Sequence, residues 1–377
     1  MIKIFQGFIF LGIMKILLVG YWEYLIYEEA LSNAFIKLGH EVVPFKIKNY
    51  RKSKNFFSNL FRKIQWGFLF GPIINKINTK LLKAVYYKKP DLIFFFKAIP
   101  IYTSTIKTIK KKCASIYLVN YNNDNPFSDR KISDRFFLNN VKLVDLNLAY
   151  RKSDFQEYYK LGAKKVYLFM SWYLPKYNYP IAEDKNLYKS KPFDVVFAGH
   201  YESDKRKDYL EEIIRNNIKL RIFGDSKIWL NVQNTSFFLS KIPRIKHLNL
   251  NKYNKIISRS KIALCFFSTR NNDVYTRRCF EIPAAKTLLI CQYSEFMSSL
   301  YKENEEIVFF RNKRELINKI KYFLENPVER ENIAEKGHLR CIKDGHDVFS
   351  RTIHLMEFIE KEKNKPLSQN LLNLKKY

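Results

Sequence analysis

Residues 14–45 read "MKILLVGYWEYLIYEEALSNAFIKLGHEVVPF", and this stretch decides the fold. It begins with a short apolar run at 14–20 and ends with a second one at 39–45, with a helical pattern up to about Leu38 between them. Gly39 is placed to end the helix. Strand, helix and strand in this order are typical of a Rossmann-like unit with a parallel sheet.

The same alternation continues along the chain and then starts again. Apolar runs at 91–96, 115–121, 145–150 and 165–170 follow in the first half. The stretch 174–192 is polar, contains prolines and has no period, and then "FDVVFAG" at 193–199 opens a second series. Short apolar runs separated by helices predict parallel sheets covered on both faces. With 377 residues, two α/β domains are expected.

The expected organisation divides the chain at the break in the alternation. A last amphipathic helix is predicted near the C-terminus, with apolar residues along one face. The predicted segments are an N-terminal domain at 14–175, a linker at 176–192, a C-terminal domain at 193–346, a C-terminal helix at 347–363 and a tail at 364–377. The turn after the first strand has one glycine, which argues against a dinucleotide-binding G-x-G-x-x-G loop.

Charge and cysteine content indicate which partners and which cellular compartment the protein has. Lys and Arg number 67 against 36 Asp and Glu, a formal net charge of +31, which indicates a nucleic-acid partner, an anionic membrane surface or lysine spread over the whole surface. Five cysteines without a C-x-x-C pair favour a reducing cytoplasm. Residues 1–13 lack a signal-peptide cleavage site, so we expect Met14 to be the functional start or 1–13 to be a short appendage.

The segment from Lys46 to Lys89 holds twelve Lys or Arg and no Asp or Glu. Aromatic and aliphatic residues at helical spacing lie between these cations, which is typical of a helix that lies in a membrane interface. A basic helix that packs its aromatic face on its own domain gives the same pattern. Nucleic acid is a third interpretation, although no recognised binding motif accompanies the charge.

The segment "DVYTRRCFEIPAAKTLLI" at 273–290 concentrates charge just before an apolar strand. We expect a helix from about Val274, with Asp273 as its N-cap and Pro283 limiting it near Ala284. Arg277 and Arg278 are then spaced to pair with Glu281. One interpretation is a capped helix with surface ion pairs; the other is a site for a sugar diphosphate, met by arginine forks and a carboxylate in a cleft at the carboxyl ends of both sheets.

These motifs resemble those of GT-B glycosyltransferases of the "glycosyl transferases group 1" kind, and within it the branch named for spore maturation protein CgeB. The segment "YTRRCFEIPAAKTLLI" is similar to that branch's pattern R-x-F-E-x-x-A-x-G followed by a strand. "DVVFAGHYESDKR" and "LRIFGD" upstream, and "EIVFF" and "IAEKGHLRCIKDGHDVFSR" downstream, are also similar. The resemblance implies two Rossmann-like domains that face across a cleft, with the C-terminal helix crossing back to the N-terminal, acceptor-side domain.

The resemblance also implies that the C-terminal domain binds a nucleotide sugar, which is a co-substrate and not a cofactor, without a bound metal. By this match Glu281 contacts the ribose, Asp273 approaches the transferred sugar or caps the helix, and Arg278 faces the diphosphate. The other donor-binding residues it implies are Gly199, His200 and Arg206 near the phosphates, Gly224 and Asp225 near the nucleobase, and Arg277. Lys286 stands where the family usually has glycine; it either adds charge at the diphosphate or blocks the loop.

The base that activates the acceptor is expected in the first domain. Asp124 in "NNDNPF" follows a strand and is the first candidate, with Glu23 after the first strand as the second. The alternative is that Asp124 and Asn125 only form an Asx turn before Pro126.

The function expected from the sequence is metal-independent transfer of a sugar from a nucleotide-activated donor to a glycan, lipid-linked or cell-envelope acceptor. The protein is expected in the cytoplasm, with residues 46–89 as the candidate contact with the inner face of the membrane, and nucleic acid is not the expected partner. The alternative is a non-catalytic protein of the same fold that binds an anionic membrane or nucleic acid. The changed position Lys286 and the single-glycine first turn keep this alternative open.

Overall fold

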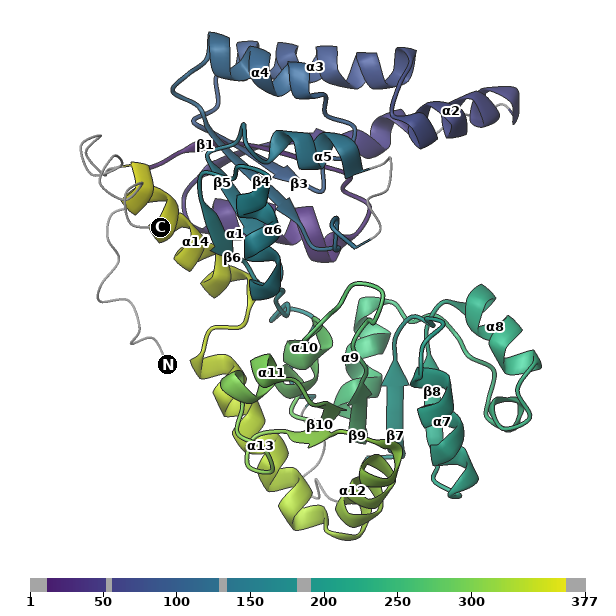
Figure 1. Ribbon diagram of the computed structural model, residues 1–377. Coiled ribbons are helices and arrows are strands. Elements are labelled where there is room, and N and C mark those ends of the chain that lie inside the picture. Colours follow the sequence, from purple (N-terminus) through teal and green to yellow (C-terminus); the bar gives the residue numbers. More distant parts are fainter. Residues whose placement is uncertain (1–11, 52–55, 129–133, 182–190, 364–377) are drawn as a thin grey trace. The chain divides into compact units, whose positions relative to one another are not determined.

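A computed structural model describes residues 12–51, 56–128, 134–181 and 191–363. These residues form two compact units (Figure 1), each with its own parallel sheet. Unit 1 contains the chain up to Met170 together with the segment from Val348 onward, and unit 2 contains Ser171–Asp347. The predicted α/β class with two parallel sheets is therefore confirmed.

Unit 1 is built on a six-stranded sheet of order β2-β1-β3-β4-β5-β6. Its strands are β1 (Lys15–Gly20), β2 (Glu41–Lys46), β3 (Leu92–Phe96), β4 (Tyr117–Asn122), β5 (Leu146–Ala149) and β6 (Val166–Leu168). All neighbouring pairs are parallel. β2 contains Pro44 but lies at the edge of the sheet, where a residue without an amide proton is tolerated.

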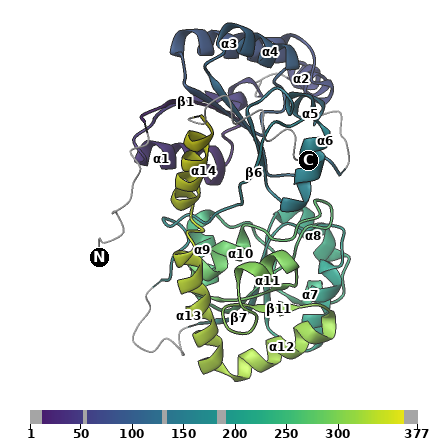
Figure 2. The same ribbon diagram turned by 60° about the vertical axis from the view of Figure 1, so that its left-hand side comes forward.

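Helices cover both faces of this sheet. They are α1 (Ala30–Lys37), preceded by the π-helical turn η1 (Leu25–Glu29), α2 (Phe56–Phe68), α3 (Pro72–Lys88), α4 (Thr103–Lys112), α5 (Arg135–Asn140), α6 (Phe155–Lys160) and α14 (Val348–Lys363), with short 3-10 turns at Ile47–Tyr50 and Lys152–Asp154. Buried residues of α3 and α4 pack on β1, β3 and β4 in one core. α1 and α14 lie side by side (Figure 2). The last helix thus belongs to unit 1, as expected for a helix that returns to the first domain.

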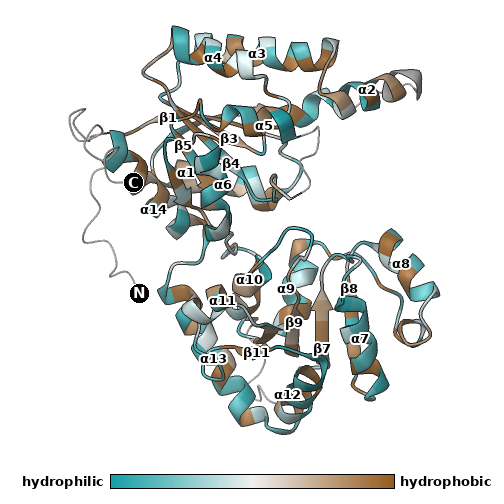
Figure 3. Cartoon of the chain, viewed as in Figure 1, coloured by the Kyte–Doolittle hydropathy of each residue, from teal (hydrophilic) through white to brown (hydrophobic). Residues whose placement is uncertain are grey.

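Unit 2 contains a five-stranded parallel sheet of order β11-β10-β9-β7-β8. Its strands are β7 (Phe193–Ala198), β8 (Leu220–Phe223), β9 (Ser260–Cys265), β10 (Leu288–Gln292) and β11 (Val308–Phe310). Its helices are α7 (Arg206–Arg215), α8 (Ser226–Asn234), α9 (Leu250–Ser258), α10 (Arg278–Ala284), α11 (Glu295–Leu300), α12 (Lys313–Glu325) and α13 (Pro327–Lys343), with a 3-10 turn at Leu239–Lys241. Figure 3 shows β7 and β9 in apolar brown, whereas α7 and α13 carry many hydrophilic residues. This contrast is the pattern expected of central strands buried under amphipathic helices.

Both sheets have a point at which the strand order reverses. In unit 1 the chain moves from β1 to β2 on one side and then to β3 on the other. In unit 2 it moves from β7 to β8 and then to β9 on the opposite side. Ligands of open α/β sheets bind outside the carboxyl ends of the strands at such a point. The carboxyl ends of β1 and β3, and of β7 and β9, are therefore the places to look for a site.

The structure moves one predicted domain boundary and leaves several predicted segments undescribed. Unit 2 begins at Ser171, a few residues before the predicted boundary at 175/176, because Tyr173 forms a bridge with Asp347 and both Trp172 and Tyr173 are buried. Much of the predicted linker, most of the 1–13 appendage and the tail lie outside the described residues. The structure contains no helix, among those it describes, with the length and apolar character needed to cross a membrane.

Candidate functional site

The carboxyl end of β7 is the centre of the candidate site in unit 2. Arg278, the first residue of α10, directs its guanidinium to this strand end, where Nη1 donates to the carbonyl of Ala198 at 3.0 Å. Its guanidinium also lies over the ring of Phe197, with 5.7 Å between its central carbon and the ring centroid. A fixed cation is thus held at the strand end where the sheet order reverses.

Two glycines make this approach of side chain and backbone possible. A Cβ atom on Gly199 would lie 2.3 Å from Nη1 of Arg278, and one on Gly224 would lie 2.3 Å from the carbonyl oxygen of Gly199. The indole of Trp229 fills the remaining space and donates to the Gly199 carbonyl at 2.9 Å. Both glycines are therefore required by contacts, and the carboxyl edge of the sheet brings Gly199, Gly224 and Arg278 together.

The loop that follows Gly199 is held by Arg206. Its guanidinium forms a fork with Asp204 at 2.8 and 2.7 Å and donates to the carbonyl of His200 at 2.6 Å. The side chain is 3% exposed. Arg206 is thus engaged with the protein, and it holds the first-turn loop through the side chains of Asp204 and Glu202 and the backbone of His200. Its predicted contact with a phosphate stays a prediction, and its observed contacts make it a residue that positions this loop.

His200 lies among charged groups at the same edge. Burial, and next the positive charge of Arg278, lower the pKa of its imidazole, while Asp225 and Glu202 act in the opposite direction. Asp225 caps α8 by accepting from the amides of Lys227 and Ile228, and the amide of Ile228 contributes most to lowering the pKa of this exposed carboxylate. A neutral His200 can donate one hydrogen bond to a phosphate oxygen without adding charge.

The altered pKa of His200 leads to a testable prediction. We expect the folded imidazole to titrate below its ordinary value of about 6.5. The unfolded chain then takes up the proton first as pH falls, so this group reduces stability as pH falls through 6.5 to the lowered value. Replacing Arg278 by alanine removes one cause of the lowered pKa. The midpoint of the His200 titration should therefore rise, as measured by NMR titration of the imidazole ring protons. A midpoint no higher in the variant than in the parent would contradict this assignment.

Glu281 follows Arg278 by one turn of α10 and is 2% exposed. Its Oε1 pairs with Nε of Arg277 at 2.6 Å, which confirms one of the two predicted ion pairs. Arg278 makes its hydrogen bond to the β7 carbonyl instead. Oε2 of Glu281 and Nε of Arg278 are both buried. The Tyr253 hydroxyl lies beside Glu281 and the Cys265 thiol lies beside Arg278, so protein groups surround this part of α10.

The start of α10 corrects the prediction for Asp273. The helix begins at Arg278 and is capped by Arg277, so Asp273 is not its N-cap. Residues 269–277 form an irregular loop after β9 because the Asp273 amide donates back to the Ser268 carbonyl at 2.9 Å, which closes a turn before any helix can start. Pro283 lies inside α10, which ends at Ala284 as predicted.

Asp273 instead lines a cavity of about 530 Å³ beyond the carboxyl ends of β9, β10 and β11. The cavity wall is formed by Phe267, Ser268, Thr269, Asn272, Asp273, Gln292, Tyr293, Phe310 and Arg311. Most of these side chains are polar, and the cavity has the size of a small-ligand site. Of these residues only Asp273 was predicted. Their common signal is that each lies at the carboxyl end of a strand or in the loop after it, which marks the functional edge of an open α/β sheet.

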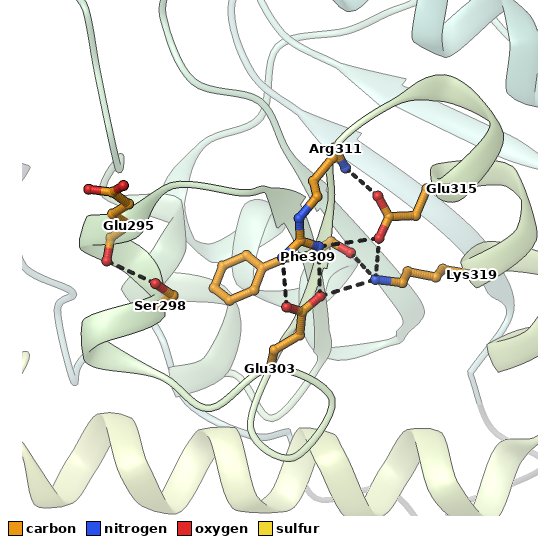
Figure 4. A network of polar contacts seen from close by, with 7 residues as sticks. All are labelled: Glu295, Ser298, Glu303, Phe309, Arg311, Glu315 and Lys319. Carbon is orange, nitrogen blue, oxygen red and sulfur yellow. Dashed lines mark hydrogen bonds and ion pairs between the residues drawn. The ribbon is translucent and has the colours of Figure 1, made fainter.

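Arg311 is held at the cavity by a network of charges (Figure 4). Its guanidinium binds both oxygens of Glu303 at 3.0 and 2.9 Å and contacts Glu315 at 3.3 Å, and Lys319 binds both glutamates. Hydrogen bonds from Arg311 contribute most to lowering the pKa of Glu303. Two carboxylates balance two cations, so the network fixes the Arg311 side chain against the ring of Tyr293 at 4.2 Å.

Lys286 is the predicted site residue that the structure separates from the rest. It lies just before β10 and therefore at the amino end of the sheet, opposite the edge that carries Gly199 and Arg278. Its ammonium pairs with Glu335 of α13, so it neither adds charge at the diphosphate position nor blocks that loop. Its φ of 56° lies in the left-handed region, a conformation that suits the glycine which the resemblance implies at this position.

In unit 1 the two predicted carboxylates lie beyond the carboxyl ends of β1 and β4. Glu23 pairs with Arg51 at 2.5 Å, and Asp124 pairs with Lys97, which follows β3. Asn122 accepts from the Asp124 amide and Asn125 from the Phe127 amide, both at 3.0 Å, so the alternative prediction of an Asx turn holds for Asn125, whereas the Asp124 carboxylate pairs with Lys97 instead. Trp22 and Lys97 have φ values of 59° and 45°. Strained backbone at such strand ends is typical of functional edges.

Glu28 is an acidic residue of this edge that the sequence analysis did not single out. It is 3% exposed, lies in the π-helical turn after β1, and accepts from the Trp22 amide at 3.1 Å. Burial raises the pKa of its carboxyl group, an effect that the hydrogen bond from Trp22 opposes. Its carboxyl packs where a Cβ of Gly20 would lie, at 2.4 Å. The single glycine after the first strand thus accommodates Glu28.

Comparisons with known proteins agree with this architecture. Residues 205–357 match the glycosyl transferase-like family, which is less than half of the chain. Anabaena HepE in complex with UDP and glucose is similar over 92% of this chain and 100% of its own, with 12% identity and a TM-score of 0.63. This is the fold of GT-B glycosyltransferases.

Two further structures show the same fold. A glycosyltransferase from Rickettsia africae is 14% identical, covers 94% of this chain and 100% of its own, and has a TM-score of 0.65. A sucrose-phosphate synthase from Thermosynechococcus elongatus is 11% identical, with 92% and 98% covered and a TM-score of 0.66. No curated protein matches the sequence. The matching family confirms the wider glycosyltransferase resemblance, whereas the CgeB-like branch stays a prediction.

Proposed function

We propose that the protein is a glycosyltransferase of the branch that includes the CgeB-like proteins. In this proposal it moves a sugar from a nucleotide-activated donor. The observation that carries the proposal is the arrangement at the carboxyl end of β7, where Gly199 and Gly224 let the guanidinium of Arg278 lie against the strand end. A diphosphate has the charge and size to bind beside a fixed arginine and glycine backbone. The match of residues 205–357 to a glycosyl transferase-like family supports the same chemistry.

In this proposal Arg278 stabilises the charge of the leaving nucleoside diphosphate. Negative charge grows on the β-phosphate as the glycosidic bond breaks, and a cation held in place before the reaction lowers the barrier. His200 donates to a phosphate oxygen in its neutral form, and Glu281 accepts from the ribose hydroxyls. Asp273 and the cavity that it lines are assigned to the transferred sugar because hydroxyl-rich ligands need several polar partners.

The acceptor side is assigned to unit 1. Asp124 is proposed as the base that removes the acceptor's proton, with Glu23 as the second candidate. Glu23 follows β1, where the order of that sheet reverses, and Asp124 follows β4 at the same carboxyl edge; both are carboxylates held beside a cation. Related structures are named as complexes with UDP or with UDP-glucose, which supports UDP-sugars as the first donors to try. We propose a glycan, lipid-linked or cell-envelope molecule as acceptor.

Nucleotide binding and turnover are tested in one series of measurements. A nucleotide at a hundredfold excess over its Kd should stabilise the protein by about 2.7 kcal/mol, seen as a rise in Tm. We expect this rise with UDP or GDP, and we expect release of nucleoside diphosphate from at least one nucleotide sugar. Stabilisation without release from any sugar or acceptor would favour a non-catalytic binding protein. Absence of stabilisation by every nucleotide would contradict the donor site itself.

A further inference from the structure

Helix α2 has an apolar stripe that none of the described residues covers. Leu60, Phe61, Ile64 and Phe68 are between 50% and 61% exposed, and Phe70, just after the helix, is 70% exposed. At about 100° per residue, the four helical positions fall within about 100° of the helix circumference. The large side chains of one continuous face of α2 are thus in contact with solvent.

The other side of α2 attaches the helix to unit 1. Gln65 is 4% exposed and accepts from the Ile73 amide at 2.8 Å, and Trp66 packs on the core of that unit. Arg62 donates to the carbonyl of Tyr50 at 3.1 Å, and Arg135 of α5 donates to the carbonyl of Phe68 at 2.6 Å. The exposed stripe is therefore a second apolar face, distinct from the face with which α2 packs on unit 1. Figure 1 shows α2 extending away from α3 at the side of the unit.

Helices α2 and α3 carry exposed positive charge in the same unit as this stripe. Lys63 of α2 and Lys76, Lys80 and Lys83 of α3 are exposed, and these four make no ion pair with any described residue. The spacing of the three α3 lysines places them on the outer face of that helix, since Ile77, Leu81 and Val85 face the core. No acidic residue occurs between positions 46 and 89 to oppose them.

We propose that the exposed stripe of α2 inserts into the surface of an anionic lipid bilayer, with the lysines of α2 and α3 at the headgroups. A large apolar face bordered by cations is the composition of helices that lie in a membrane interface. Lysines add attraction to anionic headgroups, whereas nucleic acid would not account for exposed aliphatic side chains. The lipid surface thus matches both the apolar and the charged part of the patch. This inference does not depend on the proposed sugar transfer.

Flotation with lipid vesicles tests the proposal on the full chain. We expect binding to phosphatidylcholine vesicles that contain phosphatidylglycerol, release at high salt, and little binding to phosphatidylcholine alone. The double variant F61S/F68S should bind these vesicles at least about tenfold more weakly than the parent does. The variant K76Q/K80Q/K83Q should lose roughly fivefold for each lysine at the bilayer surface. Both variants alter exposed side chains, so their Tm and their stabilisation by nucleotide should stay at parent values.

Matched controls come from unit 2. Phe237 is 71% exposed, and Lys219, Lys313 and Lys336 are exposed without ion pairs to described residues. F237S and K219Q/K313Q/K336Q should bind vesicles as the parent does. Equal binding by F61S/F68S and the parent would overturn the proposal, and so would indifference to lipid charge. Displacement of the protein from vesicles by single-stranded RNA, with F61S/F68S binding that RNA normally, would identify a nucleic-acid surface and also overturn it.

Discussion

Replacing Arg278 by alanine is expected to lower kcat by about 10²–10³-fold. The guanidinium lies at the carboxyl end of β7, 3.0 Å from the Ala198 carbonyl, and in the proposed mechanism it faces the diphosphate. Losing this charge removes stabilisation that matters most when the leaving group is most negative. The measurement is the steady-state release of nucleoside diphosphate by the variant and the parent, with Tm recorded for both.

Two further variants separate the charge from its geometry. Arg278→Lys keeps the charge but loses the planar fork, so it should recover only part of the lost rate. Arg221→Ala serves as the matched control, because this arginine also lies over aromatic rings of the same sheet, at 5.8 Å from Phe223, but within β8. It should leave kcat near the parent value. Normal turnover by a folded Arg278→Ala variant would remove the donor site from this strand end.

Replacing Glu331 by glutamine is expected to destabilise the protein by about 3–5 kcal/mol. Glu331 of α13 is 8% exposed and binds two buried cations, Lys191 at 2.8 Å and Arg330 at 3.1 Å. Burial lowers the pKa of Lys191, and Glu331 opposes that effect. Without the carboxylate, two positive groups stay buried side by side. Lys191 directly precedes β7, so the loss also loosens the start of the strand that carries the site.

Urea denaturation measures this loss of stability. Glu335→Gln is the control, because Glu335 lies one turn further along α13 and pairs with Lys286, but its side chain is 40% exposed. Exposed pairs contribute about 0–1 kcal/mol, so this variant should stay close to the parent. A similar loss of folding free energy in both variants would contradict the prediction, because it would show that burial does not make the Glu331 ion pairs more important than an exposed pair.

The architecture could be predicted because it depends on local patterns. The runs at 14–20 and 193–199 are apolar except for Lys15 and Asp194, and such largely apolar runs are typical of strands buried on both faces in an α/β protein. The structure forms β1 and β7 at these runs. Gly199, Gly224 and Arg278 were predicted only through the resemblance to GT-B glycosyltransferases, and the structure places the three close together at the carboxyl end of β7.

Residues whose role depends on distant partners were harder to predict. Asp273 looked like an N-cap because of its residue type, but a turn closed by the Ser268 carbonyl delays the helix to Arg278. Arg311 and Gln292 line the cavity only because β10 and β11 end beside β9. Glu28 became notable through its burial, which the sequence does not display.

The sequence by itself determined the two parallel sheets, the order of their elements and the excess of positive charge between positions 46 and 89. Periodicity, glycine positions and composition act between near neighbours, so they can be read without coordinates. Only the tertiary structure decided that Arg278 contacts β7 instead of Glu281, that Lys286 lies at the opposite edge, and that the stripe on α2 faces solvent. These outcomes depend on which distant backbone and side chains compete for each group, and that competition is resolved only when the chain is packed.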